Sequence, residues 1–182
     1  MTVIAAAEDS TGVWIGSDSK GIAGDVTYEL GSKIIKKNQY YIGFSDSYRA
    51  ADLIRECDDF PQTIGSMNTL RQFRDTLKDI MIKDGCSTMG SEGNTIMHPI
   101  DVLIISNNGI YSVDGDYQIH KIDSYAATGS GFQLAMGALR SVMSATGSAK
   151  EAVMLAVEAA IYHSSSCGGD VYVECIHRRN RG

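Results

Sequence analysis

Short runs of apolar residues, separated by polar turns, dominate the start of the chain. One run covers residues 1–7, a polar turn follows at 8–11, and a second run covers 12–20. Two strand-like runs joined by a tight turn predict a β-hairpin. Because the strands of a hairpin are antiparallel, the end of the second strand lies beside the start of the first. Asp18 is therefore expected next to the N-terminal residues.

The same pattern predicts six more strands farther along the chain. They cover residues 33–37, 40–44, 101–106, 110–114, 118–122 and 170–176. Asn108-Gly109 is a strong hairpin signal between two of them. Two spans rich in glycine and polar residues, 19–32 and 86–98, are interpreted as loops.

Apolar residues at helical spacing predict four helices in two pairs. The first pair follows Ser45-Asp-Ser47 to about residue 57 and then covers about 66–83; the second pair covers 132–145 and 149–162. Gly147 is expected to end the third helix, and Ser148 to cap the fourth. The fourth helix carries a stripe of alanine and valine, so it is expected to lie close against its neighbour or a sheet.

The elements follow the order strands, helices, strands, helices, strand. Neighbouring strands are mostly joined as hairpins, which predicts mainly antiparallel sheets. Two sheets packed face to face, with helices on the outer face of each, would bury all the apolar faces. We therefore expect an α+β fold, a four-layer α/β/β/α sandwich, formed by residues 1–182 as one domain.

Composition narrows the class of protein. A hydrophobic fraction of 43% and a charged fraction of 21% are ordinary for a soluble globular protein, and the net charge of −6 argues against a broad nucleic-acid surface. No apolar run is long enough to span a membrane, and no leader sequence is visible. The four cysteines lack CxxC or disulfide spacing, and the four histidines lack ligand spacing. We expect a cytoplasmic protein with reduced thiols, without a cofactor or zinc site, and leave other metals open.

Thr2 is the first candidate for chemistry. Methionine is commonly trimmed when a small residue follows it, so Thr2 could become the mature N-terminus. Its hydroxyl would then be a latent nucleophile, and its α-amine, with an ordinary pKa of about 7.7–8.0, could accept the proton. One residue would carry both nucleophile and base.

Five features occur in order along almost the whole chain. They are Thr2, Gly16-Ser-Asp18-Ser, Lys33 heading an apolar strand, Ile42-Gly-Phe44 before a helix with Ala50-Ala-Asp52, and Ala127-Thr-Gly-Ser130-Gly131 before two alanine-rich helices. Together they resemble the proteasome β-subunit family, especially its bacterial HslV-type branch, within the N-terminal nucleophile (Ntn) hydrolases.

The resemblance implies a threonine-type endopeptidase and assigns a role to each site residue. Thr2 would be the nucleophile and its α-amine the base. Lys33 would lower the pKa of that amine or of the hydroxyl, and Asp18 would orient Lys33 through an ion pair. Ser130 would hydrogen-bond the amine and help to relay the proton.

The resemblance also implies an assembly. The family encloses its nucleophile in stacked rings, so a ring-shaped homo-oligomer acting on peptides or unfolded proteins is expected, with an open helical arrangement as the alternative. No G-x-x-x-x-G-K-[ST] motif occurs in the chain, so a separate ATP-driven AAA+ unfoldase is the expected partner. The alternative functions are a catalytically silent assembly or scaffold protein that retains Met1, and a small-molecule Ntn amidase.

Two stretches depart from the family pattern. The family usually has glycines, and a backbone N–H that stabilises the oxyanion, where this chain has Ser45-Asp46-Ser47. An acidic side chain there would oppose developing negative charge. Proteasome subunits carry an aspartate near the end of the last helix, where this chain has His163-Ser-Ser-Ser166, although HslV-type members also lack that acid.

Three plainer interpretations of the candidate residues remain open from the sequence. Asp18 and Lys33 could form an exposed ion pair of little energetic value. Ser130 could serve only as a helix N-cap. Cys167, four residues after His163, could be the nucleophile of a different site.

Overall fold

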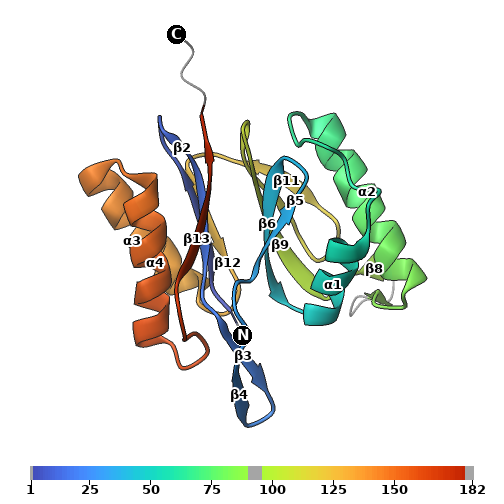
Figure 1. Cartoon of the computed structure of the whole chain (residues 1–182), viewed down its shortest axis with the longest axis horizontal. Helices are drawn as coiled ribbons and strands as arrows, with labels where there is room; N and C mark the ends of the chain where they lie inside the picture. The colour runs from blue at the N-terminus through green and yellow to red at the C-terminus, as the bar shows by residue number, and fades with distance from the viewer. Residues whose placement is uncertain (1, 90–95, 179–182) are drawn as a thin grey trace.

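Two antiparallel β-sheets face each other in this computed structural model, which describes residues 2–89 and 96–178 (Figure 1). The first sheet contains, in spatial order, β12 (Tyr125–Thr128), β1 (Ile4–Glu8), β2 (Gly12–Ser17) and β13 (Tyr172–His177). The second contains β11 (Ile119–Ile122), β10 (Gly109–Val113), β9 (Ile100–Ser106), β6 (Tyr40–Asp46) and β5 (Ile34–Lys37).

A pair of helices covers the outer face of each sheet (Figure 1). Helices α3 (Phe132–Thr146) and α4 (Ala149–His163) pack on the first sheet, and α1 (Tyr48–Glu56) and α2 (Met67–Lys83) on the second. The predicted four-layer α/β/β/α sandwich is therefore confirmed. Across residues 2–89 and 96–178, no helix combines the length and apolar character needed to cross a membrane.

Local signals set the helix ends as expected. Helices α1, α2 and α4 each begin after a serine whose hydroxyl accepts a backbone N–H: Ser47, Ser66 and Ser148. Gly147 ends α3 in the left-handed conformation, with φ of 67°.

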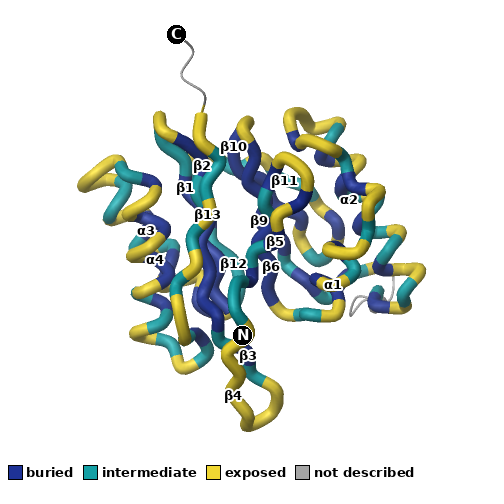
Figure 2. Tube along the Cα trace, viewed as in Figure 1, coloured by how far each residue is buried: buried dark blue, intermediate teal, exposed yellow. Residues whose placement is uncertain are grey.

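The core has three apolar layers. Figure 2 shows that the buried residues lie mainly along the strands and on the helix faces that pack against them. The layer between the sheets includes Ile4, Ile15 and Ile105, all fully buried. The layer under α4 is built from small residues, as its stripe predicted, and the helix lies so close to β2 that a Cβ on Gly16 would stand 2.6 Å from Val153. This packing holds β1 and β2 rigidly from both faces.

The span 19–32, interpreted as a loop, contains a hairpin of β3 (Lys20–Ala23) and β4 (Val26–Glu29). The hairpin projects from the body (Figure 1), and all four residues of β4 are exposed. An exposed strand has no alternating apolar face, so its pattern is weak. The signal that could have found it is the two-residue turn Gly24-Asp25, in which Gly24 has φ of 60°.

Three smaller differences from the expected elements also occur. Strand β12 precedes α3 where only a lead into the helix was expected. The 86–98 loop contains a short ladder of β7 (Thr88–Met89) with β8 (Ile96–Met97), and its residues 90–95 lie outside the described part. The β9–β10 turn is Asn107-Asn108, because Ser106 pairs with Gly109, so the expected turn is shifted by one residue.

Candidate active site

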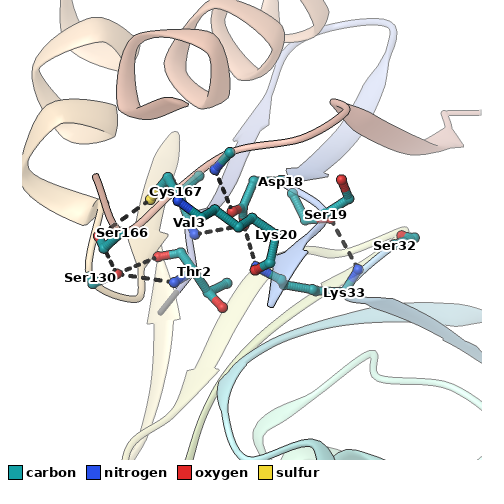
Figure 3. Close-up of polar contacts among 12 residues, drawn as sticks. Thr2, Val3, Asp18, Ser19, Lys20, Ser32, Lys33, Ser130, Ser166 and Cys167 are labelled. Carbon is teal, nitrogen blue, oxygen red and sulfur yellow. Dashed lines mark hydrogen bonds and ion pairs between the residues drawn. The ribbon is translucent and has the colours of Figure 1, made fainter. Parts of the chain in front are cut away.

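The candidate site lies where the N-terminal residues run alongside the ends of two strands. Residues 2 and 3 lead directly into β1, whose Ile4 pairs with Ser17 of β2 on one side and Thr128 of β12 on the other. Asp18 and Ser130, which follow these strands, therefore flank residues 2 and 3. Figure 3 shows the resulting group of side chains.

Asp18 and Lys33 form a fully buried ion pair. Lys33 Nζ donates to Asp18 Oδ1 at 2.6 Å and to the backbone oxygen of Lys20 at 2.7 Å, and both paired side chains are 0% exposed. The interpretation of this pair as an exposed one is therefore wrong. A buried pair is costly to break, because removal of one partner leaves the other charge desolvated.

Asp18 also ties this pair to the N-terminal strand and to a distant turn. Its Oδ1 accepts the Val3 N–H at 3.1 Å, and its Oδ2 accepts the Gly168 N–H at 3.1 Å. The carboxylate thus has donors from three separate segments of the chain. Asp18 Oδ1 accepts hydrogen bonds from both Lys33 Nζ and the Val3 N–H. It therefore links the ammonium to the backbone next to Thr2.

Burial changes the titration of the lysine. Removal of the ammonium from water lowers the pKa of Lys33 below that of an exposed lysine, while its hydrogen bond and charge interaction with Asp18 oppose the shift. Such a cation can favour the neutral form of an amine placed beside it.

Ser130 contacts Thr2 directly. Its Oγ accepts the Thr2 N–H at 3.0 Å and lies 3.3 Å from the Thr2 carbonyl oxygen. The N-cap of α3 is Gly131 and no side chain caps that helix, so the interpretation of Ser130 as only an N-cap is wrong. Thr2 itself is only 2% exposed.

Two further serines, which the sequence did not indicate as site residues, extend this contact away from Thr2. Ser130 Oγ lies 2.9 Å from Ser166 Oγ, which lies 2.7 Å from Ser164 Oγ. Three hydroxyls in hydrogen-bond contact can pass protons along a chain, because each can donate and accept. The signal that could have found them is the serine run directly after α4.

The Ser45-Asp46-Ser47 turn differs from a glycine-containing turn in its side chains more than in its backbone conformation. Asp46 has φ of 75°, a left-handed conformation that favours glycine. Its carboxylate accepts the Ser45 hydroxyl at 2.9 Å, and its side chain is exposed. The turn therefore adopts a glycine-like conformation and carries a carboxylate that a glycine would lack.

Cys167 lacks the features of an activated nucleophile. Burial and the nearby Asp18 carboxylate raise the pKa of its thiol, whereas a reactive thiol needs a lowered one. His163 is exposed and its ring packs against Tyr162. These observations argue against the Cys167–His163 alternative. In the described ranges, no three His, Cys, Asp or Glu side chains gather closely enough to hold a metal ion.

Gly129 is needed where β12 passes Thr2. It has φ of 85°, and a Cβ there would overlap the Thr2 carbonyl oxygen. We expect Gly129→Ala to destabilise the fold by about 1–3 kcal/mol, because both strain and overlap result. In Gly137→Ala, the matched control in α3, the added Cβ meets nothing within 4 Å, and a gain of about 0.5–1 kcal/mol is expected. Urea unfolding measures both; equal stability of the two variants would contradict the prediction.

Comparison with known proteins places this geometry in a known fold. No protein-family model matches the chain, and no curated protein matches its sequence. Among solved structures, it is similar to Thiobacillus denitrificans BPH, with 20% identity over 98% of this chain and 99% of that chain and a TM-score of 0.84. In complex with epoxomicin, the same protein gives a TM-score of 0.85, with 20% identity over 97% of this chain and 99% of that chain.

The chain is also similar to a eukaryotic HslV from Trypanosoma brucei, with 17% identity over 97% of this chain and 99% of that chain and a TM-score of 0.69. Each of these similarities extends over almost the whole length of both compared chains. The chain therefore has the proteasome-type HslV fold that the five sequence features predicted.

Proposed function

We propose that this chain is an HslV-type threonine peptidase that hydrolyses peptide bonds through Thr2 once Met1 has been removed. The observation that carries the proposal is the convergence of two groups on residues 2 and 3. Ser130 contacts the Thr2 nitrogen at 3.0 Å, and the buried Lys33–Asp18 pair is anchored to the Val3 N–H. The HslV fold supports the same function.

The proposed reaction has two steps. In the first, Thr2 Oγ1 attacks the scissile carbonyl carbon while the Thr2 α-amine takes the hydroxyl proton; the C–N bond then breaks, and the leaving amine receives that proton. This leaves an ester between Thr2 and the acyl half of the substrate. In the second, water attacks the ester, the amine accepts the water proton, and the carboxylic product leaves as Oγ1 is reprotonated.

The neighbouring residues would act on this amine and hydroxyl without being consumed. The Lys33 ammonium would keep the amine in its neutral, basic form, and Asp18 would position Lys33. Ser130 would orient the amine, and the chain from Ser130 through Ser166 to Ser164 would exchange its proton. This hydroxyl chain would occupy the place of the aspartate found in proteasome subunits.

We also propose that the subunits form a closed ring in the cytoplasm and receive unfolded protein from a separate AAA+ unfoldase. Several large apolar side chains on α3 and α4 are exposed in the single chain: Phe132, Leu134, Met154, Leu155 and Tyr162. Contact between copies would cover such a surface. An open helix of subunits is the alternative, since a small change of contact angle stops a ring from closing.

The function is tested on the purified full-length protein by three measurements. Intact mass spectrometry is expected to show a chain that begins at Thr2. A quenched fluorescent peptide is expected to be hydrolysed, and epoxomicin is expected to inhibit that hydrolysis. Light scattering is expected to give a multiple of the chain mass. Retained Met1 without hydrolysis would contradict the peptidase and favour the scaffold. Hydrolysis of small amides but not of peptides would instead favour the amidase, and a monodisperse monomer would contradict the ring.

A further inference from the structure

A cavity of about 270 Å³ lies between the two sheets, close to Thr2. Strand β12 of the first sheet lines one side, and β9, β10 and β11 of the second sheet line the other. Thr128, one of its lining residues, directly precedes Gly129, where a Cβ would touch both Thr2 and Ser45. Asp101, another, pairs with Ser45 in the β6–β9 ladder. Two residues that line the cavity are therefore immediate neighbours of Gly129 and Ser45, which lie beside the candidate nucleophile.

The lining is polar at positions that elsewhere belong to the apolar core. Alternate residues of a strand share a face, so Asp101 lies on the face of Leu103, and Ser112 on the face of Ile110. Both of these apolar residues belong to the buried layer between the sheets. A carboxylate and a hydroxyl thus replace core side chains where the cavity opens.

Within the described part of the chain, the polar side chains of the lining include no cation to balance the carboxylate. Ser112 is 9% exposed and lines the cavity. Asp101 accepts one hydrogen bond, from Thr128 Oγ1 at 3.3 Å. Burial, and to a smaller extent the carboxylates of Asp46 and Asp114, raise the pKa of Asp101, while its hydrogen bond from Thr128 opposes the shift. No lysine, arginine or histidine lines the cavity along the described residues.

A ligand that completes this site must supply positive charge and hydrogen-bond donors. We propose that the cavity binds a lysine or arginine side chain of the substrate near the scissile bond, with Asp101 as its ion-pair partner and Ser112 as a second acceptor. This inference rests on the proposed peptidase function. Ammonium and guanidinium groups carry only donors, which matches the carboxylate and the hydroxyl oxygen. The described residues offer no three-ligand cluster for a metal, so a side-chain cation fits better than a metal ion.

Binding can be tested apart from catalysis with n-butylguanidinium, a mimic of an arginine side chain. Protein NMR titrations at constant ionic strength compare it with neutral n-butylurea. We expect n-butylguanidinium to bind about tenfold or more tightly than n-butylurea, because a hydrogen bond to a charged group is worth more than a neutral one. Equal affinity, or no binding of n-butylguanidinium, would overturn the proposal, as would its displacement by millimolar calcium or magnesium chloride.

Variants assign the binding to the cavity. Asp101→Asn removes the charge and keeps the shape, and it is expected to weaken n-butylguanidinium binding about tenfold or more. Ser112→Ala gives a second, smaller loss. Asp123→Asn is the matched control, because Asp123 is an exposed carboxylate between β11 and β12 that does not line the cavity. Unchanged binding in Asp101→Asn and Ser112→Ala would overturn the assignment.

Turnover then separates this inference from the proposed function. Peptides that differ only by lysine or norleucine beside the scissile bond are compared by kcat/KM. The wild-type protein is expected to prefer lysine, and Asp101→Asn to reduce the lysine-to-norleucine ratio about tenfold or more. Hydrolysis of both peptides at equal rates would overturn the cavity assignment and leave the peptidase standing. Hydrolysis of neither peptide would overturn the peptidase itself, and the NMR titration would still decide whether the cavity binds a cation.

Discussion

Replacement of Thr2 with alanine is expected to reduce peptide hydrolysis by about 10⁴-fold or more, the scale of loss when a nucleophile is removed from a hydrolase. The variant keeps its α-amine but has no hydroxyl to form the ester. Initial rates with a quenched fluorescent peptide measure the loss. Intact mass spectrometry on the same sample verifies that Met1 has left, which the small alanine at position 2 still permits.

Two control variants make this result specific. Thr2→Ser retains a primary hydroxyl and is expected to keep most of the activity. Thr63→Ala removes an exposed threonine hydroxyl before α2 and is expected to change nothing. If Thr2→Ala hydrolyses the peptide at the wild-type rate, Thr2 is not the nucleophile. Equal loss in all three variants would point to damage unrelated to the hydroxyl.

Replacement of Lys33 with alanine is expected to destabilise the fold by about 3–5 kcal/mol and to reduce hydrolysis nearly as much as loss of Thr2. The stability loss arises because Asp18, with 0% exposure, would lose the Lys33 ammonium and remain buried. The activity loss arises because nothing then favours the neutral amine. Denaturant unfolding and peptide hydrolysis measure the two effects.

A control and a double variant separate the two effects. Lys36→Ala removes an exposed lysine from β5, the strand that begins directly after Lys33, and is expected to change stability by less than about 0.5 kcal/mol. The double variant Lys33→Met with Asp18→Asn removes both charges, so part of the stability should return while hydrolysis stays low. If Lys33→Ala is as stable as Lys36→Ala, the pair is not the buried anchor described above.

Much of the fold could be predicted because burial leaves a periodic trace in the sequence. The β1–β2 hairpin, the β5–β6 hairpin and α2 each present one apolar face to a core layer, so their pattern alternates at the strand or helix period. The position of Asp18 beside the N-terminal residues followed from the antiparallel geometry of the first hairpin alone. Strand β4 was missed because it buries no side chain.

The remaining parts of the site depend on pairings that no local pattern reports. Ser130 meets Thr2 because β12 pairs with β1, although 128 residues separate the two contact positions. Ser164 and Ser166 resemble any polar turn until that turn is seen beside Ser130. In the sequence, Asp101 is simply a polar residue near the start of a strand. The cavity that it lines between the sheets becomes apparent only when β12 is seen on the opposite side.

The hydrogen bond from Gly168 to Asp18 spans 150 residues, so it joins two segments that are far apart in the sequence. A ribosome releases the chain from its N-terminus first, and α4 must emerge before this turn can reach the carboxylate. The Ser166 contact with Ser130 depends on the same late segment. A nascent chain therefore contains Thr2 well before it acquires the complete surroundings of Thr2, which require the turn after α4. Such long separations also favour slow folding.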